Sequence, residues 1–334
     1  MDSTDSQVVN RVVEWLGNDH TVYLVTVVQT WGSSPRPAGS MLAVNAEGTP
    51  VGSVSGGCIE EHLIQRIVNG EIAQTLPEIV LYGVTREEGD RFGLPCGGEI
   101  QLVVEKLTDL AEWQRLQTCL TDRSLLCRTL DLDSGAVQLD DSRPAQLCAI
   151  KNNRLVRLFG PRWQLIIVGA GDLSRAVATV ALGLDYQVII SDPRPEFADN
   201  WDLAGAELSR EMPDDLIRTR AIDDHCAIVA LTHDPRYDDM ALMEALESDA
   251  FYVGSLGSSR THAARLKRLA ALDLPADAIA RLRGPIGLPI GSHTPMEIAI
   301  SIAAELIAVR NQAALATRQF APVLATPHEQ AANG

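Results

Sequence analysis

Apolar residues in the first half of the chain follow two different spacings. Val8, Val12 and Leu16 recur every three to four positions, which predicts an amphipathic helix over residues 6–19. The segment CIEEHLIQRIVNG at 58–70 has the same spacing and predicts a second helix. Strand-like apolar runs are TVYLVTVV at 21–28, MLAVNAEGTPVGSVS at 41–55, PEIVLYGV at 77–84, EIQLVVEKL at 99–107 and a hairpin at 131–140. These elements predict an N-terminal α+β domain over residues 1–158.

After a break at FGPRW near residue 160, strands and helices alternate. Predicted strands are QLIIV, QVIIS, CAIVAL and FYVGS, and helical patterns follow the first, third and fourth of them. A last helix follows Thr294, with Glu297 placed for a capping box and Pro295 at its first position. This alternation predicts a Rossmann-like, doubly wound parallel sheet over residues 159–316. The fold class is therefore α/β, with a mobile tail expected at 317–334.

Charge and composition exclude several kinds of partner. The 334 residues carry 28 basic and 44 acidic side chains, a formal net charge of -16. Binding to nucleic acid or to an anionic membrane needs a basic surface, so neither is expected. No apolar run approaches the ~20 residues of a membrane span, and the start MDSTDSQ does not resemble a signal peptide. We therefore expect a cytoplasmic protein that binds neither membranes nor nucleic acid.

A glycine turn joins the first strand of the second domain to its helix. Gly169 and Gly171 allow the backbone to approach a ligand, and a pyrophosphate can bind at the helix N-terminus. Asp192 follows the next strand, about 20 residues on, where a carboxylate would hold a ribose hydroxyl. Ser174 stands where a third glycine is usual. The turn alone is compatible with an NAD(P)-dependent oxidoreductase, for which His233 is the best acid or base.

Two cysteines of the first domain lie beside glycine pairs. Gly56 and Gly57 precede Cys58 at a predicted helix N-terminus, where the helix dipole favours the thiolate. Cys96 precedes Gly97 and Gly98 in a second turn. Exposed turns contribute little packing, so we interpret both cysteines as functional. The other four lie within helix or strand patterns and are predicted to be buried in the core: Cys119, Cys127, Cys148 and Cys226.

Further candidates follow the strands of the second domain. Arg194 and His233 lie in turns after predicted strands, and Gly257 lies in a third such turn. Ligands of open parallel sheets bind outside the carboxyl ends of the strands. We therefore expect these residues to gather around a ligand, with Arg194 placed to pair with a phosphate.

These segments together resemble the XdhC/CoxI family. The motifs that carry the resemblance occur in order from about residue 24 to 310: GSSPRPAGSMLAV, GSVSGGCIEEHL, GLPCGGEIQLVVE, the Rossmann turn, SDPRPEFA, ALTHDPRYD, YVGSLGSS and RGPIGLPIGSHTPMEIAISIAAELIAVR. The resemblance implies an accessory protein that binds the molybdenum cofactor, as molybdopterin or its cytosine dinucleotide form. It also implies protection of the cofactor during sulfuration by a cysteine desulfurase and insertion into an apo molybdenum hydroxylase of the xanthine dehydrogenase or aldehyde oxidoreductase type.

Under this interpretation the protein is a chaperone without turnover of its own. Gly169, Gly171 and Asp192 would hold a pyrophosphate and ribose, and Cys58 and Cys96 would contact molybdenum or relay sulfur. A cofactor-synthesising cytidylyltransferase and a second copy of the chain are further expected partners. A cysteine-dependent sulfurtransferase with true turnover uses the same residues and stays open as an alternative.

Overall fold

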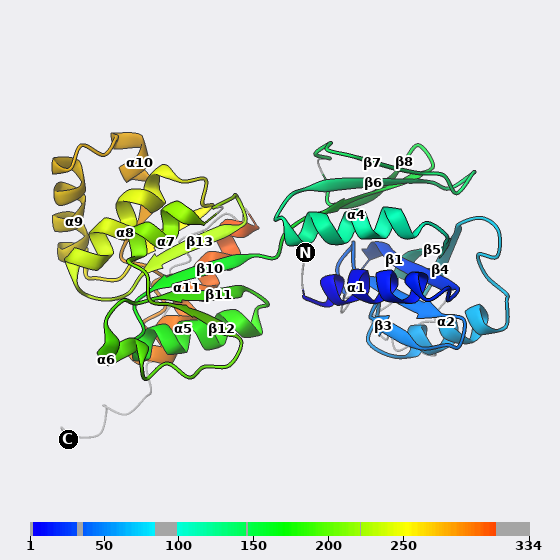
Figure 1. Ribbon diagram of the computed structural model, residues 1–334, viewed down its shortest axis with the longest axis horizontal. Helices are drawn as coiled ribbons and strands as arrows, with labels where there is room; N and C mark the ends of the chain where they lie inside the picture. The colour runs from blue at the N-terminus through cyan, green and yellow to red at the C-terminus, as the bar shows by residue number, and fades with distance from the viewer. Residues whose placement is uncertain (1–2, 32–35, 84–98, 145, 221, 312–334) are drawn as a thin grey trace, which may run out of the picture.

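The computed structural model describes residues 3–31, 36–83, 99–144, 146–220 and 222–311, apart from the side chains of Ser3 and Cys58. Two regions lie side by side along the longest axis (Figure 1). The first contains two antiparallel sheets, and the second contains one parallel sheet. The expected tail at 317–334 lies outside the described residues.

A five-stranded antiparallel sheet with the order β3-β2-β1-β5-β4 forms the centre of the first region. Its strands are β1 (Val22–Trp31), β2 (Met41–Asn45), β3 (Pro50–Gly52), β4 (Glu78–Tyr82) and β5 (Glu99–Leu107). Helix α2 (Cys58–Val68) packs on one face through Ile59, Leu63 and Ile67. Helices α1 (Ser3–Gly17) and α4 (Leu110–Thr121) cover the other face. Because both faces are covered, the first seven residues of β1 are all buried.

A second sheet with the order β7-β6-β9-β8 packs beside α4. Its strands are β6 (Leu126–Asp131), β7 (Val137–Asp140), β8 (Cys148–Lys151) and β9 (Arg154–Phe159). A buried ion pair joins it to the first sheet, since Arg128 donates to both carboxylate oxygens of Glu105 at 2.7 Å. Arg128 also donates to Glu112 of α4 at 2.6 Å. These bonds satisfy a guanidinium that is only 3% exposed.

The second region is a six-stranded sheet with the order β12-β11-β10-β13-β14-β15, in which all pairings are parallel. Its strands are β10 (Gln164–Val168), β11 (Gln187–Ser191), β12 (Ala206–Ser209), β13 (Cys226–Ala230), β14 (Tyr252–Ser255) and β15 (Leu282–Arg283). Numbered within the region, this is the 3-2-1-4-5-6 order of dinucleotide-binding Rossmann sheets. The predicted fold class is therefore confirmed.

Helices cover both faces of the parallel sheet, because successive residues of a strand point to opposite sides. Helices α5 (Asp172–Gly183) and α11 (Pro295–Arg310) pack on one face. The other face is covered by α7 (Pro213–Thr219), α8 (Pro235–Glu247) and α9 (Ser259–Ala271), and two short helices, α6 (Pro195–Ala198) and α10 (Ala276–Ala280), lie in connections. The capping box predicted for the last helix is confirmed at Thr294 and Glu297.

The amino ends of the parallel strands face the first region. A pocket at the junction is lined by Gln164 and Gln187, which begin β10 and β11, together with Thr121 of α4. Arg123 forms a bidentate ion pair across the junction with Asp223, at 2.9 and 3.0 Å. The carboxyl edge of the parallel sheet consequently faces away from the first region. Within the described residues, no helix has the length and apolar character that a membrane span requires.

Candidate functional site

The turn before α2 is shaped by a carboxylate of the helix itself. Glu60, in the first turn of α2, folds back over the segment Ser53–Gly57. The Glu60 carboxylate accepts hydrogen bonds from four consecutive backbone amides, Val54 to Gly57, at 2.7–3.0 Å. The hydroxyls of Ser53 and Ser55 donate to it as well. Gly56 has φ +96°, a conformation that glycine adopts without strain.

These donors stabilise the ionised form of Glu60. Burial raises the pKa of a carboxyl group, but hydrogen bonds from Ser55, Gly56 and Gly57 outweigh burial here, and the pKa of Glu60 is lowered from 4.5 to about 2. The sequence pattern carried a signal for this arrangement, because Glu60 is three residues after the N-cap Gly57, as in a capping box. Gly57 supplies only the backbone half of that motif. A fixed negative charge therefore lies in the first turn of the helix that Cys58 begins.

The cysteines divide into two groups. Cys119, Cys127, Cys148 and Cys226 are buried and free, which confirms their predicted place in the core. Cys58 is the first residue of α2, preceded by Gly57 as N-cap, so the predicted helix start is confirmed. Cys96, Gly97 and Gly98 lie outside the described residues, as does the side chain of Cys58. The functional roles of Cys58 and Cys96 stay predictions.

The glycine turn of the second region lies at the carboxyl end of β10, between β11 and β13. Gly169 has φ +107°, and a Cβ atom there would approach within 3.0–3.3 Å of Thr232, which follows β13. Gly171 is the N-cap of α5, has no side chain to cap it, and faces open space within 4 Å. The first-turn amides of α5 are therefore accessible to a ligand at the point where the strand order reverses.

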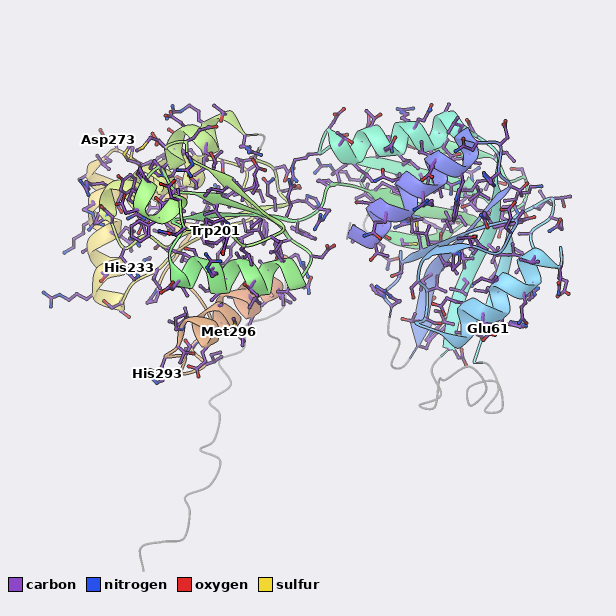
Figure 2. The ribbon with its side chains drawn as sticks, turned by 60° about the horizontal axis from the view of Figure 1, so that its bottom comes forward. Glu61, Trp201, His233, Asp273, His293 and Met296 are labelled. Atoms are coloured by element: carbon purple, nitrogen blue, oxygen red, sulfur yellow. The ribbon has the colours of Figure 1, made fainter. Side chains whose placement is uncertain are left out.

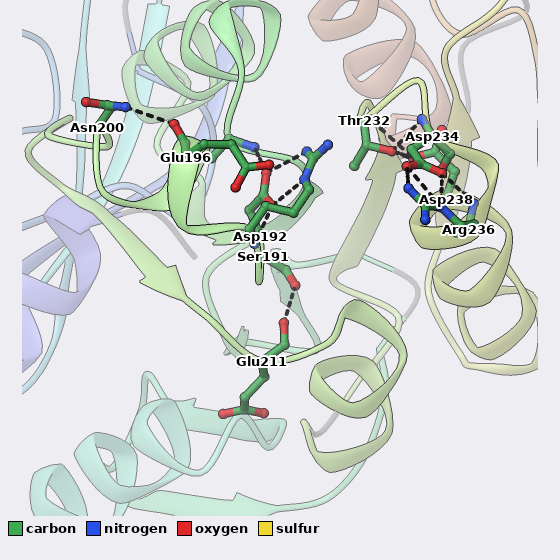
Figure 3. Close-up of polar contacts among 11 residues, drawn as sticks. Ser191, Asp192, Glu196, Asn200, Glu211, Thr232, Asp234, Arg236 and Asp238 are labelled. Carbon is green, nitrogen blue, oxygen red and sulfur yellow. Dashed lines mark hydrogen bonds and ion pairs between the residues drawn. The ribbon is translucent and has the colours of Figure 1, made fainter.

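Asp192 is fully engaged within the chain (Figure 3). It is 1% exposed and accepts a hydrogen bond from the amide of Ala170 at 2.8 Å. Arg194 donates three more, from its amide at 3.1 Å and from Nε and Nη2 at 2.8 Å each. The Arg194 guanidinium also lies over the rings of Phe197 and Tyr237, 4.1 and 5.1 Å from their centroids. Asp192 therefore positions the glycine turn and Arg194, and the ribose contact expected from the sequence stays a prediction.

His233 and Gly257 lie in turns that a buried ion-pair network supports. His233 is exposed, with φ +63°, between Thr232 and the N-cap Asp234 of α8. Asp238 accepts from Thr232 Oγ1 at 2.7 Å and from Arg265 Nη2 at 2.9 Å. Arg265 Nη1 in turn donates to the carbonyl of Leu256, at 3.0 Å, next to Gly257. Arg265 thus joins the turns after β13 and β14.

Among the described residues, the candidates of the two regions lie at opposite ends of the molecule. Glu61 of α2 and His233 are far apart along the long axis (Figure 2). Gly169, Asp192, Arg194 and His233 follow strands of one sheet edge, and that edge faces away from the first region. The structure therefore brings the Rossmann candidates together but does not bring them to the Gly56–Cys58 turn of the same copy.

Fold and site define a two-region α/β protein with a Rossmann sheet and a glycine–cysteine helix turn. Residues 165–306 match the sequence profile of the XdhC Rossmann domain, and residues 15–83 match that of the XdhC and CoxI family. The two profiles together match more than half of the chain, so the protein belongs to the XdhC/CoxI family, and the resemblance seen in the sequence is confirmed.

Several known proteins are similar over nearly the whole chain. A Bacillus subtilis protein, named as a probable subunit of xanthine dehydrogenase, is 26% identical, covering 90% of this chain and all of that protein. The molybdenum cofactor insertion chaperone PaoD of Escherichia coli is 28% identical, covering 89% of this chain and 86% of PaoD. A crystal structure described as a xanthine dehydrogenase from Bacillus halodurans has a TM-score of 0.71 and 27% identity, covering 96% of this chain and 99% of that one.

Proposed function

We propose that this protein is an insertion chaperone for the molybdenum cofactor. It binds the cofactor, protects it while a cysteine desulfurase adds the terminal sulfur, and delivers it to an apo molybdenum hydroxylase. The observation that carries the proposal is the similarity to PaoD, named as such a chaperone, over 89% of this chain. The Rossmann edge with an uncapped helix N-terminus supports it, because such an edge suits a phosphate-bearing cofactor.

The glycine–cysteine turns have the metal-proximal role in this proposal. Thiolate is a soft ligand suited to a thiophilic metal, so Cys58 and Cys96 contact molybdenum or pass sulfur to it. Gly169, Gly171 and Arg194 hold the phosphate end, with His233 and Gly257 in the neighbouring turns. The protein itself turns over no substrate.

The proposed partners follow from the same role. They are the apo hydroxylase, a cysteine desulfurase, a cytidylyltransferase where the dinucleotide form is carried, and a second copy of this chain, all in the cytoplasm. With a net charge of -16, the chain favours encounter with a basic face of a partner, since charge complementarity raises association rates.

Cofactor content tests the proposal directly. Protein purified without oxygen from cells that synthesise the cofactor is denatured, and the released molecule is identified by fluorescence and mass spectrometry. An oxidised pterin supports the proposal, and a cytidine nucleotide beside it identifies the dinucleotide form. Release of a nicotinamide nucleotide without any pterin would contradict it and favour an oxidoreductase.

Cysteine variants test the role of the turn. Cys58→Ser is expected to lower activation of the apo hydroxylase while the fold is retained. Cys119→Ser is the matched control, because a serine hydroxyl can keep the hydrogen bond that the Cys119 thiol donates to the carbonyl of Ser124 at 3.0 Å. Equal activation by wild type, Cys58→Ser and Cys96→Ser would remove both turn cysteines from the mechanism.

A further inference from the structure

The acceptor positions of the Asp192 carboxylate are all occupied. A carboxylate offers about four lone-pair positions, and Asp192 accepts four hydrogen bonds, one from Ala170 and three from Arg194. Its side chain is 0% exposed. A ligand hydroxyl can reach this carboxylate only if Arg194 moves away. In dinucleotide-binding Rossmann sheets the acid at this position accepts from the ribose hydroxyls, and Asp192 has no capacity left for that contact.

Hydrogen-bond donors that are not used within the chain also lie near this edge. Arg194 uses Nε and Nη2 for Asp192, and its Nη1 makes no hydrogen bond to the part of the chain that the structure describes. The N-terminus of α5, a helix of 12 residues, has no side-chain cap. Ser174 in its first turn is 1% exposed, and its hydroxyl has no partner among the described residues. A buried hydroxyl without a partner is costly unless a ligand or water satisfies it.

Three carboxylates besides Asp192 limit the positive field here, and one of them is Glu196 in the first turn of α6, whose charge acts on Arg194. Asp172 lies in the first turn of α5. Asp234 lies near Arg194, but its charge is compensated by the guanidinium of Arg236 at 2.7 Å. The cationic side chain beside the glycine turn is Arg194. Its Nε and Nη2 are paired with Asp192, two aromatic rings hold its guanidinium in place, and its Nη1 is the donor left for an anion. A guanidinium fixed in this way suits the geometry of a phosphate group.

We propose that this edge is a phosphate site in which Arg194 selects against recognition of a nucleoside ribose. The ligand is held by its phosphate end, at Arg194, the first turn of α5 and Ser174. The identity of the cargo rests on the proposed function. With a molybdenum cofactor as ligand, the site binds the terminal phosphate of molybdopterin and does not recognise the ribose of a cytidine nucleotide.

Calorimetric titration of the full chain with inorganic pyrophosphate, cytidine 5′-diphosphate and its 2′,3′-dideoxy analogue tests the proposal. Wild type is expected to bind the two nucleotides with dissociation constants within about twofold of each other, since no ribose hydroxyl is recognised. Arg194→Ala is expected to weaken pyrophosphate about tenfold or more. Arg194→Ala also frees the Asp192 carboxylate to accept from ribose hydroxyls. The variant is therefore expected to bind cytidine 5′-diphosphate more tightly than its dideoxy analogue. Arg194→Lys, which keeps the charge but not the fork, gives the same direction if Arg194→Ala fails to fold.

Arg218→Ala is the matched control, because Arg218 is an exposed arginine near the end of α7 that pairs with Asp215 and Glu244. This change is expected to leave all three affinities unchanged. The proposal is overturned if wild type binds the ribonucleotide about tenfold more tightly than the dideoxynucleotide, with the preference lost in Asp192→Asn. It is also overturned if none of the three probes binds at millimolar concentration. Pterin content of the same wild-type preparation separates the two proposals. If the protein contains a pterin but prefers the ribonucleotide, only this inference is wrong. If it contains no pterin but binds the phosphate probes without ribose preference, only the chaperone role is wrong.

Discussion

Glu60→Gln is expected to destabilise the first region at neutral pH and to leave it little affected in strong acid. Glutamine keeps one carbonyl oxygen but places an NH₂ group against donors, among them the Gly57 amide and the Ser55 hydroxyl. Donor groups that lose their acceptor incur a desolvation cost. Glutamine also lacks the negative charge that the six hydrogen bonds from Ser53–Gly57 stabilise in the native protein.

The pKa gives the size and the pH window of the effect. A native pKa of about 2 against 4.5 in the unfolded chain corresponds to an upper limit of about 3 kcal/mol. Glu60 is only half-buried, so solvent screening reduces the contribution to about 1–2 kcal/mol. Because the native pKa is lowered, this stability is fully present above pH 4.5 and is lost as the pH falls toward 2.

The effect is measured by urea unfolding of wild type and variant at several pH values. Tryptophan fluorescence reports on the first region once Trp163 and Trp201 of the second region are replaced by phenylalanine in both proteins. Glu61→Gln is the matched control, because Glu61 is the exposed neighbour on the same helix (Figure 2). A loss of stability that is the same at pH 7 and pH 3 would refute the electrostatic reasoning. So would a Glu60→Gln variant as stable as Glu61→Gln at pH 7.

Three further predictions concern the second region. Arg265→Ala should lower the free energy of unfolding by about 3–5 kcal/mol, since it leaves buried carboxylates unpaired. Arg268→Ala is the control and should cost under about 1 kcal/mol, because this side chain is 40% exposed. Equal shifts of the melting temperature in the two variants would contradict this prediction. Gly169→Ala should lower the melting temperature because of its φ of +107°, while Gly171→Ala, in open space, should keep it and weaken pyrophosphate binding in calorimetry. Burial raises the pKa of the Cys226 thiol to about 12, so maleimide labelling at pH 8 with peptide mapping should leave Cys226 unmodified until the protein unfolds.

Long elements with clear periodicity could be predicted from the sequence, and short or mixed ones could not. The strands and helices around the glycine turn have strong patterns, and they are present as β10, α5 and β11. Helix α4 was not predicted, because its buried face rests on Trp113, Leu116 and Cys119 amid polar residues. Strand β12 has four residues at the edge of the sheet, too few for a periodicity to emerge. Tertiary pairing, and not local pattern, specifies such an element.

The candidate site divides in the same way. Chain position and turn chemistry were enough to place Gly169, Gly171 and Asp192 at one sheet edge. The hydrogen-bond partners of Asp192 could not be predicted from the sequence. A carboxylate that follows a strand gives the same sequence pattern whether it binds a ribose or a neighbouring arginine. The separation of the Cys58 turn from this edge was also beyond reach, because it depends on how two independently patterned regions pack at a junction.

Because the Cys58 turn and the Rossmann edge are separated in one copy, a complementation experiment can test whether both contact the same cofactor. A ligand that contacts both the Cys58 turn and the Gly171 edge must be bound between two copies. In one copy Glu61 of α2 and His233 of the sheet edge lie at opposite ends (Figure 2). Cys58→Ser and Gly171→Ala are each expected to lose cofactor retention. Mixed one to one by denaturation and refolding, half of the dimers contain both variants, and each has one intact site, so about one quarter of wild-type retention returns. The double variant that carries both changes is the control, because a dimer of two such copies contains no intact turn of either kind. If the mixture retains no more cofactor than the single variants, the two turns do not act on one ligand across a dimer.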